Sequence, residues 1–149
     1  MSKENSTLTP GGGFLIGPSS PECLMTPERF SDEVKTISET AREFMLKKVV
    51  PKSEALEKKV EGLMVALFKE CGSLGLLGIE VPEEYGGLGM GKVASAAASE
   101  EVGRQASFAV TFGGHTGIGT LPIVYFGTPA QRQKYLPRLA TGELMAAYA

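Results

Sequence analysis

The feature that most restricts what this chain can fold into is an uncharged stretch, because no Asp, Glu, Lys or Arg occurs from Gln105 to Gln131. A segment without charges is normally buried, since exposing so much apolar surface to water is unfavourable. Yet this stretch also lacks side-chain volume at its glycines. A packed core has no use for such missing volume unless another backbone or a ligand fills the space. The residues responsible are Gly113, Gly114, Gly117, Gly119 and Gly127.

The same stretch is long enough to span a bilayer, which takes ~20 predominantly apolar residues. Its glycines, threonines, proline and histidine make insertion unfavourable, so we expect no transmembrane segment. The N-terminal sequence MSKENSTLTP has neither the pattern of a signal peptide nor that of an Arg-rich presequence. These features predict a cytoplasmic protein.

Length and charge exclude other classes of protein. A chain of 149 residues can bury one ordinary core, so one domain is expected. A formal net charge of -2 argues against a nucleic-acid surface, which needs a basic excess. Cys23 and Cys71 lie far apart without metal-ligand spacing; a disulfide is possible, but two inert thiols in a reducing cytosol fit better.

Hydrophobic spacing predicts an all-α fold, an orthogonal or up-down helical bundle that ends in the start of a β-strand. Residues 1–25 are rich in Ser, Thr, Pro and Gly and are expected to be a flexible extension with an apolar anchor at 14–16. Residues 26–143 form the helical domain. The first predicted helix starts at Thr26 or Ser31 and is stopped by Pro51, and the second runs from Lys52 to about Leu74. A structured loop over 76–91 leads to a helix over 92–104, and one or two helices over 105–127 follow, broken near Gly117–Pro122. The last predicted elements are a helix from Thr128 that Pro137 bends or ends and a first strand over 144–149.

No single motif of the sequence predicts a nucleotide, metal or catalytic site. Gly86 and Gly91-Lys92 have the spacing of a phosphate-binding loop, but Val93 stands where a Ser or Thr would hold magnesium. His115, the only histidine, lacks a second ligand for a metal and an acidic partner for catalysis, so a hydrogen-bonded core residue is expected there. We therefore predict no metal site and no catalytic residue in this chain.

Taken together, several segments resemble the N-terminal part of an acyl-CoA dehydrogenase over residues 26–149. They are GLLG (75–78), VPEEYGGLG (81–89), HTGIG (115–119), FGT (126–128), QKYLP (133–137), GE (142–143) and AYA (147–149). The resemblance implies a flavoenzyme of three domains that assembles as homo-oligomers. FAD takes a hydride from the β-carbon of an acyl-CoA while a glutamate of the C-terminal domain, which this sequence lacks, removes the α-proton.

The resemblance also implies site residues and partners. Of the flavin contacts, Tyr148 alone has a plausible match. In medium-chain members larger polar residues close the acyl pocket on the equivalent helix, so the glycines here resemble the long-chain or very-long-chain branch. The residues expected to line the acyl chain are Val110, Thr111, Gly113, Gly114 and Ile118. Close helix packing remains an equal explanation of the glycines.

The sequence thus leads to one main hypothesis of function and two alternatives. The main hypothesis is part of an FAD-dependent dehydrogenase that forms enoyl-CoA from long-chain acyl-CoA in fatty acid β-oxidation and passes electrons to an electron-transferring flavoprotein. We expect the 149 residues to be inactive alone. The alternatives are an acyl-CoA oxidase of the same fold and a stand-alone helical module that binds a protein partner or lipid.

Overall fold

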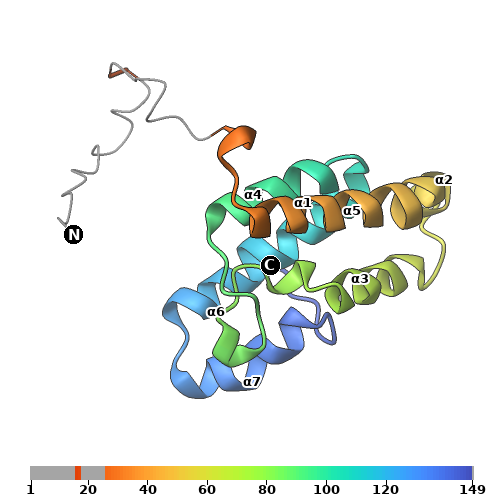
Figure 1. Cartoon of the computed structure of the whole chain (residues 1–149). Coiled ribbons are helices and arrows are strands. Elements are labelled where there is room, and N and C mark those ends of the chain that lie inside the picture. The colour runs from red at the N-terminus through yellow and green to blue at the C-terminus, as the bar shows by residue number, and fades with distance from the viewer. Residues whose placement is uncertain (1–15, 18–25, 149) are drawn as a thin grey trace. The chain divides into compact units, whose positions relative to one another are not determined.

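The computed structural model describes residues 16–17 and 26–148, and the chain divides into two compact units, residues 1–30 and 31–149 (Figure 1). In the first unit, the helix predicted to start at Thr26 is a single 3-10 turn, η3 (Pro27–Arg29), in which Arg29 N–H donates to the Thr26 carbonyl over 2.9 Å. The extension predicted over residues 1–25 lies outside the described residues apart from positions 16 and 17, so its flexibility stays a prediction.

The described residues of the second unit are all-α, which confirms the predicted fold class. The α-helices are α1 (Asp32–Phe44), α2 (Ser53–Glu57), α3 (Leu63–Ser73), α4 (Lys92–Val102), α5 (Ala106–Gly113), α6 (Leu121–Phe126) and α7 (Pro129–Ala140). Two π-helical segments, η4 (Met45–Val49) and η8 (Gly114–Thr120), and the 3-10 turns η5 (Val50–Lys52), η6 (Leu76–Gly78) and η7 (Glu83–Tyr85) join them. Side-chain caps begin two helices where the sequence predicts, at Ser31 for α1 and at Thr128 for α7.

The first helical break is not where the sequence predicts it. Pro51 does not stop the helix, because it falls in the 3-10 turn η5 and the chain stays helical to the end of α2. A proline at the first positions of such a turn needs no backbone N–H donor. The break lies instead between α2 and α3, where Lys59 and Gly62 take positive φ angles of 53° and 75°.

The second correction concerns the break predicted near Gly117–Pro122. The chain remains helical from the start of α5 to the end of α6, since η8 links the two helices without an interruption. Pro122 lies in the first turn of α6, and Pro137 lies inside α7, which continues to Ala140. A π-helical turn, which pairs each amide with a carbonyl five residues back, absorbs a local irregularity without ending the helix.

Small residues let the long helices approach closely. α1 packs mainly against α4, and Ala41 of α1 is buried along with Ala94, Ala97 and Ala98 of α4. The rings of Phe44 and Phe108 meet in this core at a centroid distance of 5.6 Å. α6 and α7 pack together at the end of the unit away from α2 (Figure 1). The core therefore holds the stretch from α5 to α6 along one side only.

After α7 the chain turns at Gly142, which has a φ of 74°. Described residues 145–148 form neither helix nor strand, so the strand predicted over 144–149 is not seen among the residues that the structure describes. Leu144 and Ala146 pack against the small core formed by Val81 and the buried side chains of α7. This contact holds the segment against η8.

Candidate functional site

The exposed side of the stretch from α5 to α6 borders open space. A Cβ atom added at Gly113, Gly114 or Gly117 would meet no heavy atom within 4 Å. A Cβ atom at Gly119 would lie only 2.3 Å from the Cβ of Ala146. Close packing within the chain therefore explains Gly119, whereas the other three glycines leave room beside the helix. They flank or lie in a π-helical segment, a conformation that is rare and frequent at functional sites.

The structure brings the five residues predicted to line an acyl chain together on this stretch: Val110, Thr111, Gly113, Gly114 and Ile118. Val110 is 76% exposed and Ile118 is 58% exposed, so two aliphatic side chains flank the glycines in solvent. Thr111 is half-buried, and its hydroxyl donates to the Ser107 carbonyl over 3.0 Å. We call the open surface formed by Val110, Gly113, Gly114, Gly117 and Ile118 the glycine face.

A groove of about 550 Å³ adjoins the N-terminal end of the glycine face. Val110 and Thr111 line one side, and Val60 and Met64, from the turn before α3 and its first residues, line the other. The sequence analysis missed this second wall because Val60 belongs to the apolar stripe of the helix predicted from Lys52 to Leu74. That helix is broken before α3, which leaves Val60 53% exposed instead of inward.

The opposite side of the same stretch is fixed by His115, which is 1% exposed. Its Nε2 lies 3.1 Å from the Leu139 carbonyl and its Nδ1 lies 3.0 Å from the backbone nitrogen of Ala146. A carbonyl only accepts and an amide N–H only donates, so the geometry requires a neutral ring with its proton on Nε2. Phe68 meets the ring edge-on at 4.8 Å. The prediction of a hydrogen-bonded core histidine is confirmed.

Burial lowers the pKa of His115, and the hydrogen bond to the Leu139 carbonyl opposes this shift. A neutral, fully enclosed imidazole with both nitrogens engaged has no free atom for a substrate. His115 therefore acts as a clamp that joins η8 to the end of α7 and to the segment that follows it.

Tyr148, the residue predicted to contact flavin, lies two positions beyond the clamped Ala146 and is 83% exposed. An exposed aromatic ring offers a flat surface on which a planar ring system can stack. The glycine face, likewise, has the open volume that a bound molecule needs. The assignment of Tyr148 to a flavin and of the glycine face to an acyl chain stays a prediction at this point.

The loop that resembles a phosphate-binding motif is engaged within the chain. Lys92 pairs with Glu80, and its Nζ lies 5.6 Å from the centre of the Tyr125 ring. The Glu80 carboxylate raises the pKa of Lys92. Backbone bonds close the loop, including Leu88 N–H to the Gly78 carbonyl over 2.9 Å. The lysine therefore serves as a tie between α4, the loop and α6.

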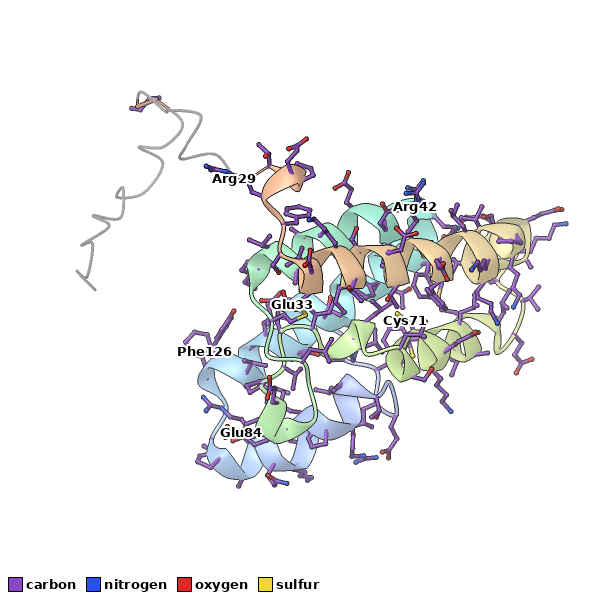
Figure 2. All side chains as sticks on the ribbon, in the orientation of Figure 1. Arg29, Glu33, Arg42, Cys71, Glu84 and Phe126 are labelled. Carbon is purple, nitrogen blue, oxygen red and sulfur yellow. The ribbon has the colours of Figure 1, made fainter. Side chains whose placement is uncertain are left out.

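Residues 16–17 and 26–148 offer neither a metal site nor a membrane span. There, no three His, Cys, Asp or Glu side chains lie close enough to share a metal ion, and none of the helices is long and apolar enough to cross a membrane. Cys71 lies on the inner side of α3 (Figure 2), and burial raises the pKa of its thiol. Cys71 is thus an inert thiol, as predicted, while Cys23 lies outside the described residues.

Comparison with known proteins identifies the domain. The family described as "Acyl-CoA dehydrogenase, N-terminal domain" matches residues 31–143. A probable acyl-CoA dehydrogenase of Bacillus subtilis is 46% identical over all 149 residues, which cover 25% of that relative. A crystal structure of an acyl-CoA dehydrogenase from Bacillus anthracis, complexed with FAD, superposes with a TM-score of 0.85 and 50% identity over 91% of this chain and 24% of that one.

More distant relatives differ in the acyl group that their names give. An isovaleryl-CoA dehydrogenase of Solanum tuberosum is 38% identical over 122 residues, 80% of this chain and 30% of that protein. A very long-chain specific acyl-CoA dehydrogenase of Mus musculus is 44% identical over 98 residues, 65% of this chain and 14% of that protein. The comparisons therefore leave the acyl length open, and the chain spans about a quarter of the length of its first relatives.

The fold and the matched segments agree over the whole helical unit. The family match covers α1 to the end of α7, which includes the loop, the glycine face and His115 with its Leu139 partner, whereas Ala146 lies beyond the matched residues. The chain therefore belongs to the acyl-CoA dehydrogenase family and forms its N-terminal domain.

Proposed function

We propose that this chain is the N-terminal domain of an FAD-dependent enzyme that converts long-chain acyl-CoA into enoyl-CoA in fatty acid β-oxidation, and that its glycine face lines the acyl chain. The observation that carries the proposal is the open space beside Gly113, Gly114 and Gly117, on an uncharged helix side. Each methylene buried against such a surface contributes ~0.8 kcal/mol. A helix face without side chains leaves room for more methylenes of the acyl chain to be buried.

The groove beyond Val110 supports a long acyl group over a short one. It continues the glycine face toward the N-terminal end of α5, and aliphatic side chains from two elements border it. Polar side chains that would cap a shorter pocket are absent from positions 110, 113, 114, 117 and 118. An acyl chain that passes the glycines therefore meets the aliphatic side chains of Val60, Met64 and Val110, and the charged residues Glu57, Lys59 and Glu61 also line the groove.

FAD, when bound, would supply the acceptor for the hydride. The residues of this chain would position the bound molecules and exclude water. Tyr148 would lie against the flavin, and the glycine face would hold the acyl chain in register. The His115 clamp fixes the backbone two residues before Tyr148. The base that removes the α-proton would come from another domain, which is why the 149 residues alone are expected to be inactive.

The remaining parts of the proposal concern the electron acceptor, the assembly and the location. We propose an electron-transferring flavoprotein as the acceptor, assembly as a homo-oligomer and a cytoplasmic location. Phe126 is 86% exposed and projects from the end of α6 (Figure 2), so it offers an apolar contact to a further domain or a second copy.

A chimera tests the enzymatic proposal. The 149 residues replace the matching segment of the Bacillus subtilis relative, and dye-linked dehydrogenation is measured with acyl-CoA substrates from C4 to C20. The proposal predicts bound flavin and the highest kcat/KM at C14 or longer. A best substrate of C8 or shorter would contradict the chain-length assignment, and oxygen uptake with peroxide release would make the protein an oxidase instead.

A further inference from the structure

One buried threonine hydroxyl departs from the pattern of the others. In or at the end of the helices, threonine hydroxyls donate to the carbonyl four residues earlier, as in Thr36 to Asp32, Thr40 to Thr36, Thr111 to Ser107, Thr116 to Phe112 and Thr141 to Pro137. Thr120 is 1% exposed, yet its Oγ1 has no partner among the described residues. Buried hydroxyls are nearly always hydrogen-bonded, because an unmade bond in the interior costs free energy.

The position of Thr120 explains why it differs. It is the last residue of the π-helical segment η8, in which amides pair with carbonyls five residues back. The carbonyl four residues before Thr120 belongs to Thr116, within the π-helical segment, whereas Thr116 itself donates to the Phe112 carbonyl of α5. The Thr120 hydroxyl makes no such bond. The hydroxyl needs another partner.

A small cavity lies beside this hydroxyl, between η8, α4 and the loop after α3. It has about 10 Å³ of space for a water-sized sphere, and one buried water molecule needs about 10–15 Å³ by this measure. Its lining is mostly aliphatic and aromatic, but it includes three hydroxyl-bearing residues, Ser95, Thr116 and Thr120, together with Glu80. A wholly apolar cavity of this size would stay dry, whereas a buried water typically makes about three hydrogen bonds.

We propose that this cavity is a binding site for a single structural water molecule. The water accepts the hydrogen bond of the Thr120 hydroxyl and bonds the hydroxyls of Ser95 and Thr116. It thereby joins α4 to η8 and lets the π-helical segment persist with its polar groups satisfied. A cation is excluded, since hard cations take six or more oxygen ligands at short distances and the cavity offers fewer.

A crystal structure of the 149-residue chain at better than 2 Å resolution tests the site directly. The proposal predicts an ordered water within hydrogen-bond distance of the Thr120 Oγ1 atom. Clear density for the surrounding side chains with no peak in the cavity would overturn it. A Thr120 hydroxyl found donating to a backbone carbonyl would overturn it as well.

Substitution of Thr120 gives an independent test, because the unfolding equilibrium constant should change in opposite directions in a hydrated and in a dry cavity. With the water present, Thr120→Val removes one of its partners, and the unfolding equilibrium constant of the chain should rise roughly five- to tenfold. In a dry cavity the same change would remove an unsatisfied hydroxyl, and the constant would fall. Thr120→Ser keeps the hydroxyl and should retain the water in the crystal, which decides the question if Thr120→Val does not fold. Thr36→Val, at an exposed threonine with an ordinary helix bond, is the control for the loss of a hydroxyl alone.

Discussion

At the scale of single residues, the glycines of one helix serve two different purposes. Gly119 makes room for the Cβ of Ala146, whereas nothing lies beside Gly117. The sequence could not separate these uses, because Ala146, which covers Gly119, follows 27 residues later, beyond α7. The composition shows how many side chains are missing, and only the tertiary fold shows which atoms occupy the space beside each glycine.

The two glycines predict opposite effects of the same substitution on the 149-residue chain. Gly117→Ala adds a methyl group in open space and should stabilise the helical stretch by about 0.5–1 kcal/mol, because alanine loses less backbone entropy than glycine. Gly119→Ala should destabilise it, since Ala146 must move. Urea unfolding followed by circular dichroism measures both. Equal effects of the two changes would mean that Ala146 does not pack on Gly119.

The His115 clamp predicts how stability depends on pH. Burial lowers the pKa of this histidine from its ordinary value of 6.5, so below pH 6.5 the unfolded chain takes up a proton that the native ring refuses. The contribution of His115 to stability is therefore complete above pH 6.5 and is lost as the pH drops below 6.5 toward the lowered pKa of the native ring. Urea unfolding at pH 7.5 and at pH 5.5 measures this loss.

His115→Gln is the matched control for that measurement. Since His115 is the only histidine of the chain, the variant should lose most of the change in stability between pH 7.5 and 5.5, whatever its absolute stability. An unchanged pH dependence in the variant would show that carboxylates cause the effect.

At the scale of elements, periodicity predicts the helices well and their breaks poorly. The caps at Ser31 and Thr128 and the small residues of α4 lie where the sequence places them. The sequence predicts breaks at Pro51 and near Pro122, yet the chain stays helical through both prolines. The π-helical segments have no signature in a hydrophobic pattern, because they follow from tertiary packing.

The real break between α2 and α3 offers a test of its own. Lys59 holds a φ of 53°, which costs a side-chain-bearing residue roughly 1 kcal/mol and costs glycine little. Lys59→Gly should therefore stabilise the chain by up to about 1 kcal/mol. Lys58→Gly, at a φ of -74°, should destabilise it. Thermal unfolding compares the two, and a loss of stability at Lys59 equal to that at Lys58 would contradict a left-handed turn there.

At the scale of the whole molecule, the sequence predicts the fold class and the family, whereas the assignment of five residues to an acyl surface stays a prediction. The groove wall at Val60 and Met64 escapes prediction, because it depends on the turn that interrupts an apolar stripe. The clamp between His115, Leu139 and Ala146 also escapes, since its three members come from distant parts of the chain. Contacts over such separations have no local signal in one sequence.

The most direct test of the acyl-binding glycine face is the chain-length profile of Gly114→Glu in the chimera with the Bacillus subtilis relative. The glutamate would end the pocket early, and the loss of about three methylene contacts at ~0.8 kcal/mol each predicts a roughly 50-fold lower kcat/KM for a C16 substrate. Activity with C4 and C6 substrates should change less than twofold. Ala130→Glu, which adds the same charge at an exposed position of α7, should leave the whole profile unchanged. An equal loss at every chain length for Gly114→Glu would contradict the account and assign the glycines to packing between domains.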